Sequence, residues 1–115
     1  MEITEKFYAS DRAVWRRWLE VNHAKKKEVW LAYFKKTSGK SGISYQDSVD
    51  EALCFGWIDG QMKGIDSESY ALRFSPRRAK SSWSAANVSR FKHLLKDGFV
   101  HEAGRRAFDT RILLE

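Results

Sequence analysis

The sequence has little cysteine and little proline. Its 115 residues include one of each, Cys54 and Pro76. One cysteine cannot form an internal disulfide, which excludes a disulfide-stapled scaffold and agrees with a reducing compartment. No apolar run approaches the roughly 20 residues of a membrane-spanning helix, and residues 1–7 lack the hydrophobic stretch of a signal peptide. We therefore expect a cytoplasmic protein without a membrane span.

The sequence is instead rich in aromatic and charged side chains. It is 14% aromatic and 31% charged, a mixture that argues against intrinsic disorder. Five Trp, seven Phe and four Tyr can bury large apolar areas, so the chain can form a core without disulfides. We expect residues 1–115 to form one domain, with no internal repeat and no linker.

Two kinds of signal predict four helices. Apolar residues recur at helical spacing, and capping residues stand before them; Ser44, for example, precedes Asp47 by three positions in a capping-box pattern. These signals place the helices at residues 10–22, with Ser10 or Asp11 as the cap, at residues 44–56, at residues 82–98, with Ser82 or Ser84 as the cap, and at about residues 101–113.

Three strands are predicted between these helices. Residues 29–34 form a short, β-prone apolar run, which indicates a central strand covered on both faces. Residues 57–75 have the alternating pattern of a hairpin around a polar turn at residues 66–69, and Pro76 ends its second strand. The order of elements predicts an α+β domain, a small antiparallel sheet of about three strands packed with about four helices.

The positive charge is concentrated in one segment. Residues 73–96 carry seven Lys or Arg and no Asp or Glu, which is +7, so the rest of the chain carries −1 of the net +6. A local field of this kind attracts anions. The segment also brings Arg77 and Arg78 to a predicted helix start, where free N–H groups and serine hydroxyls are donors that phosphate and carboxylate prefer.

We therefore expect a non-catalytic module that binds an anionic small molecule or polymer between the hairpin and the third helix. Arg77 and Arg78 would bind the charged group, and Trp57 or Trp83 would form an apolar wall. Arg73 and Asp59 could form an ion pair, either facing the ligand or as a structural salt bridge. The expected site comprises Trp57, Asp59, Arg73, Arg77, Arg78, Ser82, Trp83 and Asn87.

Two other classes of function stay open. Nucleic-acid binding is the second interpretation, because arginines that follow Ser75-Pro76 suit phosphate or minor-groove contacts. An enzyme of unknown class is the third interpretation. It ranks last because the sequence does not place a nucleophile and a base at a recognisable spacing. A protein partner also stays open. The nucleic-acid interface would comprise Arg77, Arg78, Lys80, Arg90, Lys92 and Lys96.

The remaining reactive side chains have simpler explanations. Asp47, Asp50 and Glu51 lie near a helix N-terminus, where they compensate the helix dipole. The three histidines lack the spacing of a zinc pair, and Cys54 has the pattern of a small buried hydrophobe. We therefore expect no metal site, no cofactor and no catalytic residue.

Two segments taken together, Glu51–Gly60 and Arg73–Asn87, resemble the YdeI/OmpD-associated family, also called bacteriocin-protection proteins. The similarity extends over most of the chain, including Trp15–Glu20 and Glu28–Leu31. The stretch Phe99–His101 departs from the Thr-Pro helix start of that family, which affects this boundary alone. The family's signature residues correspond here to Gly56, Trp57, Asp59, Gly60, Arg73, Phe74, Pro76, Arg77, Arg78, Ser82, Trp83 and Asn87.

The resemblance implies a bacterial protein associated with resistance to antimicrobial peptides and with envelope stress. It implies no established reaction and no catalytic role for any residue. It does favour a functional role for the basic helix start over a merely structural one. Because the chain carries a net charge of +6, it would repel cationic peptides, so the implied protection is indirect.

Overall fold

A computed structural model describes residues 2–113 of the chain, with residues 112 and 113 described by their backbone alone. Within this range the chain forms four α-helices and six strands, which confirms the predicted α+β class. The helices are α1 (Arg12–Asn22), α2 (Tyr45–Cys54), α3 (Ala85–Lys96) and α4 (Glu102–Asp109). The strands are β1 (Lys6–Tyr8), β2 (Val29–Phe34), β3 (Trp57–Gly64), β4 (Ser69–Pro76), β5 (Ser82–Trp83) and β6 (Ile112–Leu113), and a short 3-10 helix, η1, covers Lys36–Ser38.

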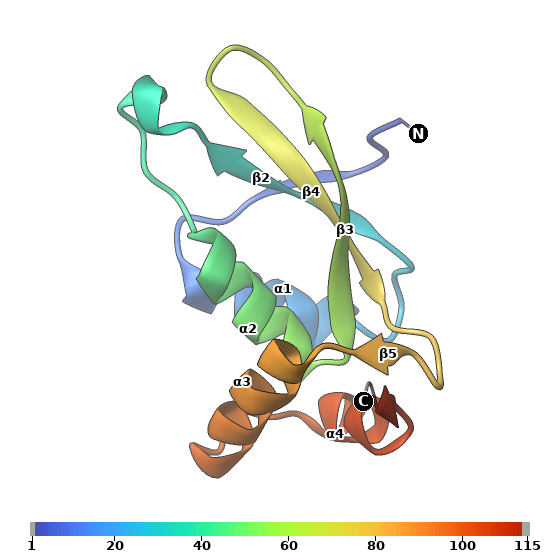
Figure 1. Cartoon of the computed structure of the whole chain (residues 1–115). Helices are drawn as coiled ribbons and strands as arrows, with labels where there is room; N and C mark the ends of the chain where they lie inside the picture. The colour runs from blue at the N-terminus through green and yellow to red at the C-terminus, as the bar shows by residue number, and fades with distance from the viewer. Residues whose placement is uncertain (1, 114–115) are drawn as a thin grey trace.

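The main sheet has four strands in the order β1-β2-β4-β3. The three predicted strands are confirmed, and β4 pairs antiparallel with both β2 and β3. The prediction of a purely antiparallel sheet of about three strands was wrong at one edge, where β1 adds a fourth strand parallel to β2. Three residues are too few to show the alternation that marks a strand in a sequence. Figure 1 shows the helices gathered toward one end of this sheet, while the β3–β4 turn extends beyond them.

The C-terminal part of the chain differs from its prediction. The fourth helix ends at Asp109 and not near residue 113, because the chain continues into β6, which pairs in parallel with β5. Ser82 therefore belongs to a short strand, and Ser84 caps α3, its Oγ accepting a hydrogen bond from the backbone N–H of Asn87. The structure thus decides between the two predicted caps in favour of Ser84.

The core lies between one face of the sheet and the helices. Val29, Leu31 and Phe74 project from this face and are fully buried against α1 and α2. Trp57 and Trp83 are each only 1% exposed. One or the other was predicted to form an apolar wall of the ligand site. In the described part of the chain, no helix has the length and apolarity that crossing a membrane requires.

Candidate anion-binding site

Arg77 is held in an unusual environment immediately after β4. Its backbone N–H donates to the carbonyl of Gly56 (2.8 Å), and its guanidinium lies over the ring of Trp83, 4.3 Å from the centroid. The Nε and Nη1 atoms are excluded from solvent and have no hydrogen-bond partner among the described residues. Burial lowers the pKa of Arg77, and the carboxylate of Asp59 partly offsets this effect. A buried donor without an acceptor is costly, so the fold leaves two donors of this guanidinium unsatisfied.

Arg77 lines a pocket of about 400 Å³. Its walls come from four parts of the chain: the end of α1, the end of α2, the segment after β4, and one side of α4. The lining residues are His23, Ala24, Phe55, Gly56, Trp57, Pro76, Arg77, Arg78, Ala79, Ala103, Arg106, Ala107 and Thr110.

The pocket lining is positively charged. It includes three arginines, Arg77, Arg78 and Arg106, and contains no Asp or Glu. Arg106 also contacts Glu102 at 3.2 Å one helical turn away, but both side chains are largely exposed and such pairs are weak. Thr110 contributes a hydroxyl group to the lining, and this hydroxyl donates to the carbonyl of Arg106. The arginines offer donors and positive charge, which suit an anion, within a lining that is otherwise largely apolar.

Two glycines bring α4 close enough to form its wall of the pocket. Gly56 adopts a left-handed conformation (φ +74°), and a Cβ there would lie 2.9 Å from the carbonyl oxygen of Ala103. At Gly104 a Cβ would lie 2.3 Å from the carbonyl oxygen of Cys54. The same Cys54 oxygen accepts the backbone N–H of His101 at 2.9 Å. The contribution of α4 was missed from the sequence, where Gly104 inside a predicted helix was the available signal.

The structure brings together part of the predicted anion site. Arg77, Arg78 and Trp57 line the pocket, and Trp83 supports Arg77 from behind. Ser82 and Asn87 do not line this pocket, because Ser82 lies in β5 and Asn87 lies in the first turn of α3. The N-terminus of α3 therefore does not contribute to this pocket.

Asp59 and Arg73 also lie outside the pocket lining, and they do not pair with each other. Arg73 Nε donates to Glu28 Oε1 at 2.7 Å. Arg73 therefore forms a structural salt bridge, one of the two predicted alternatives, but its partner is Glu28 and not Asp59. A hydrogen bond from Thr4 is the main cause that lowers the pKa of Glu28, and the hydrogen bond from Arg73 is the second. Asp59 Oδ2 instead accepts the hydroxyl of Tyr45 at 3.0 Å.

The predicted nucleic-acid interface is not continuous. Arg90 binds both carboxylate oxygens of Asp50, and Arg77 is half-buried against Trp83 and faces the pocket. The cations of this set that stay exposed and have no ion-pair partner in the described chain are Arg78, Lys80, Lys92 and Lys96. These four side chains are the members of the predicted set that remain both open to solvent and unpaired within the described chain.

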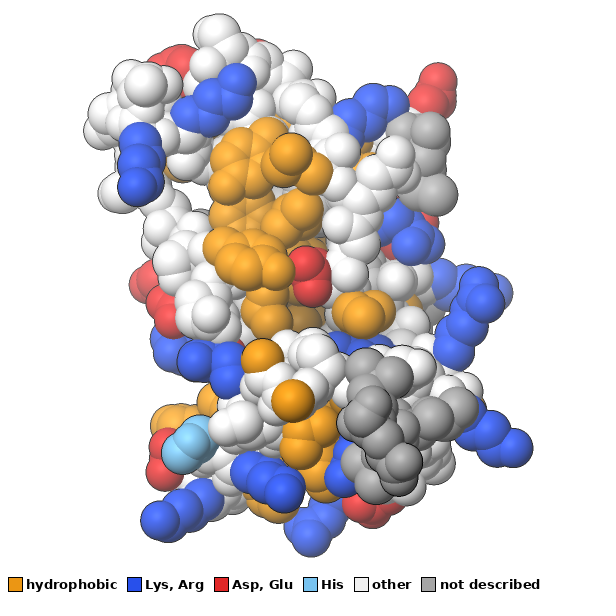
Figure 2. Space-filling view, in the orientation of Figure 1, with side chains coloured by type: hydrophobic (Ala, Val, Ile, Leu, Met, Phe, Trp, Pro, Cys, Tyr) orange, Lys and Arg blue, Asp and Glu red, His pale blue; other side chains and the backbone are white. Residues whose placement is uncertain are grey.

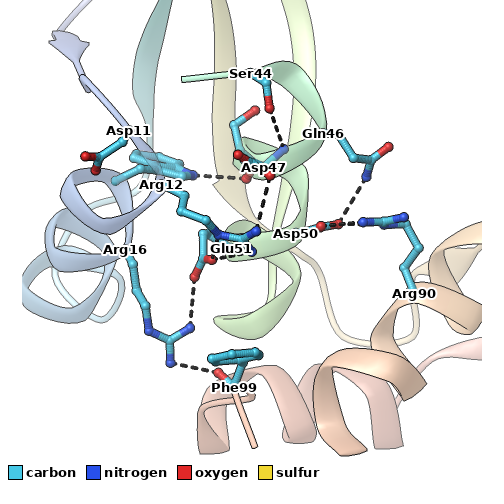
Figure 3. Close-up of polar contacts among 12 residues, drawn as sticks. Asp11, Arg12, Arg16, Ser44, Gln46, Asp47, Asp50, Glu51, Arg90 and Phe99 are labelled. Carbon is cyan, nitrogen blue, oxygen red and sulfur yellow. Dashed lines mark hydrogen bonds and ion pairs between the residues drawn. The ribbon is translucent and has the colours of Figure 1, made fainter. Parts of the chain in front are cut away.

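The acidic residues of α2 form structural ion pairs rather than a reactive pair (Figure 3). Glu51, with a side chain only 5% exposed, binds Arg16 and Arg12 of α1. Asp50, equally buried, binds Arg90 of α3. The dipole explanation was incomplete for all three acids, because Asp47 in the first turn also pairs with Arg12 at 3.2 Å. Asp50 and Glu51 join α2 to α3 and α1.

A histidine cluster borders the pocket at the start of α4. The rings of His23, Phe55 and His101 lie within 4.7–5.2 Å of one another, centroid to centroid. His101 caps α4, its Nδ1 accepting the N–H of Ala103 at 3.0 Å. Burial, the charge of His23 and that of Arg106 lower the pKa of His101. In residues 2–113 we find no group of three His, Cys, Asp or Glu able to hold a metal, and burial raises the pKa of the Cys54 thiol to about 11.

The cap on α4 predicts a loss of stability in mild acid. His101 accepts its hydrogen bond only as the neutral ring, and its pKa in the folded protein lies below the unfolded value of about 6.5. The unfolded chain therefore binds the proton first, and the free energy of unfolding falls as the pH drops from about 6.5 toward the folded pKa. We expect urea unfolding between pH 8 and 5 to show this loss.

His101→Asn is the matched control, since asparagine caps a helix but does not titrate. Its unfolding free energy should depend less on pH than that of the native chain over the same range. Charges on Arg16 and Arg106 act in the same direction as His23, and Glu102 opposes them. Equal pH dependence in the two proteins would contradict the assignment to His101.

No curated protein and no solved structure matches this chain. One family model, described as a domain of unknown function (DUF8412), matches residues 7–107. The matched range includes every pocket-lining residue except Thr110. The chain therefore belongs to the DUF8412 family of domains of unknown function.

Proposed function

We propose that this protein is a binding module for a small anion, held by Arg77 in the pocket at the ends of α1, α2 and α4. One observation carries the proposal: the Arg77 guanidinium, stacked on Trp83, has two buried donor atoms without an acceptor among the described residues. Arg78 and Arg106 add positive charge to the same pocket, and no carboxylate opposes them there.

The chemistry of the pocket favours a phosphate or carboxylate group. A guanidinium presents its donors in one plane and binds either group through two parallel hydrogen bonds. Stacking on Trp83 fixes the plane of Arg77, so little side-chain freedom is lost on binding. The rings of His23 and Phe55 offer an aromatic wall for the uncharged part of the ligand. A volume of about 400 Å³ suits a ligand of metabolite size.

Removal of the Arg77 charge tests this function. We expect Arg77→Met, which keeps an apolar stem against Trp83, to weaken anion binding at least about tenfold, the value of one charge-assisted hydrogen bond. Binding is measured by thermal shift and calorimetry against inorganic phosphate, phosphorylated metabolites, nucleotides, acidic glycans and short DNA. A ligand at 100 times its dissociation constant stabilises the native state by about 2.7 kcal/mol.

Arg17→Met is the matched control, because Arg17 is an exposed arginine of α1 outside this pocket. It should bind as the native protein does. A shift with DNA alone that disappears at moderate salt would transfer the assignment to nucleic acid, with Arg78, Lys80, Lys92 and Lys96 as the contacts. No shift with any anion would overturn the proposal.

We further propose, from the resemblance to bacteriocin-protection proteins, that the module acts in the cytoplasm and contributes to peptide resistance indirectly. The net charge of +6 repels cationic peptides, but it favours binding of an anionic ligand at Arg77. Cells that carry Arg77→Met in place of the native protein should then lose resistance. Full resistance in those cells would show that peptide resistance does not depend on anion binding at Arg77.

A further inference from the structure

Asp59 occupies a position of the sheet that faces the core. It pairs in register with Phe74, which is fully buried, and directly paired residues of antiparallel strands project to the same face. Trp57, two residues earlier on β3, also projects to this face and is buried. Asp59 itself is half-buried, so its carboxylate combines a core-facing position with access to solvent.

One tyrosine contacts this carboxylate, and two more project from the same face of the sheet. Tyr33 and Tyr70 pair in register between β2 and β4, and their rings stack with centroids 5.3 Å apart. Tyr45, the first residue of α2, donates its hydroxyl to Asp59 Oδ2. We call Asp59 and these three residues the tyrosine niche.

The tyrosine niche lies where the helices stop covering the sheet. Tyr33 is buried and forms the floor, Tyr70 is half-buried, and Tyr45 is 51% exposed. Figure 2 shows hydrophobic side chains gathered in a strip between α2 and the β3–β4 hairpin, with acidic atoms beside them and no basic side chain within the strip. The niche is therefore an aromatic surface with one acid on a protein of net charge +6.

The carboxylate keeps capacity to bind a cation. None of the ion pairs within residues 2–113 includes Asp59, and Tyr45 supplies its one hydrogen bond from a described side chain. The charge of Asp59 acts on Arg77 only from beyond ion-pair distance, so no direct cation contact occupies the carboxylate among the described residues. The faces of tyrosine rings attract cations, and a carboxylate accepts hydrogen bonds from an ammonium group. From this geometry we infer that the tyrosine niche binds the ammonium group of a small organic amine, with the apolar stem of the amine against Tyr70 and Tyr45.

The niche offers a ligand one carboxylate and the faces of the rings, which a small amine can contact together. β3, which carries Asp59, is an edge strand of the sheet, so a peptide that pairs with its backbone is the alternative that the peptide probe below tests. The niche is also distinct from the anion pocket, whose lining contains neither Asp59 nor the three tyrosines.

The test compares two probes of the same shape on the native chain. Benzylammonium carries the positive charge, and benzyl alcohol is its neutral analogue. We expect benzylammonium to bind and to shift the ring resonances of Tyr33, Tyr45 and Tyr70 in NMR titrations, with benzyl alcohol at least about tenfold weaker, since the charged hydrogen bond is lost. Equal binding of the two probes, or no binding of benzylammonium, would overturn the inference.

Two variants test whether Asp59 supplies the negative charge that benzylammonium recognises. Asp59→Asn keeps the shape and the Tyr45 contact but removes the charge, and it should reduce benzylammonium affinity at least about tenfold. Glu20→Gln, an exposed acid on α1, is the matched control and should leave the affinity unchanged. Undiminished binding by Asp59→Asn would overturn the assignment, and tighter binding of a capped lysine tetrapeptide than of benzylammonium would overturn the small-amine class. The two-probe comparison on the native chain does not depend on the folding of either variant.

Discussion

Gly104→Ala should lower the free energy of unfolding by about 3 kcal/mol, although alanine is the better helix former. The added Cβ would lie 2.3 Å from the carbonyl oxygen of Cys54 and 2.8 Å from that of Leu53, which are backbone atoms that no rotamer change can move. α4 must then shift away from α2, and the hydrogen bond from His101 N–H to Cys54 is weakened or lost. Helix propensity alone predicts the opposite sign, a gain of about 1 kcal/mol.

Gly64→Ala provides the comparison. Gly64 lies in β3 with ordinary backbone angles, and a Cβ there meets no atom within 4 Å. Urea unfolding should place this variant within about 0.5 kcal/mol of the native chain. The Gly104 variant should also bind phosphate more weakly, because α4 carries Arg106 and one wall of the pocket. A Gly104→Ala protein as stable as the native chain would show that α4 does not pack in this way.

The second large effect concerns the buried carboxylate of Glu51. Arg12→Met combined with Arg16→Met leaves this group, with a side chain only 5% exposed, without either of its cations. Removal of the partners of a buried charge costs about 3–5 kcal/mol. Glu51→Gln should cost less, because the side chains of Arg12 and Arg16 are 43% and 29% exposed and can turn toward water.

A double-mutant cycle separates the ion pairs from other contacts of these arginines. Arg16 also donates to the carbonyl of Phe99 at 2.7 Å, and that contact is lost whether or not Glu51 is charged. Adding Glu51→Gln to the double arginine variant should therefore restore part of the lost stability, measured by urea unfolding. If the triple variant were less stable than the double variant, charge burial could not be the cause of the loss.

The elements predicted correctly are those whose signals are local in sequence. Ser44 accepts the N–H of Asp47 as its capping pattern predicts, and Asp66 accepts the N–H groups of Glu68 and Ser69 at the hairpin turn. β2 is buried along its first five residues and lies between two other strands, as its apolar run predicts. In each case the residues that specify the structure lie within a few positions of one another.

What sequence analysis missed depends on partners far away in the chain. Glu51 meets Arg12 39 residues away, and Asp50 meets Arg90 40 residues away, so neither pairing leaves a local pattern. Of the residues that line the anion pocket, sequence analysis named Arg77, Arg78 and Trp57, which lie in the two motifs, but not Arg106. Its other walls could not be predicted, because small residues such as Ala24 and Ala103 acquire a role only when the helices that carry them meet.

The position of α4 in the chain also determines when the pocket can exist during synthesis. The ribosome makes Arg77 and Trp83 before it makes residues 103–110, which form the last wall. Until α4 has left the exit tunnel and packed on α2, the guanidinium of Arg77 stays open to water on that side. The nascent chain thus acquires its charge-selective cavity after its sheet, and a ligand that requires the complete pocket cannot act on the earlier folding steps.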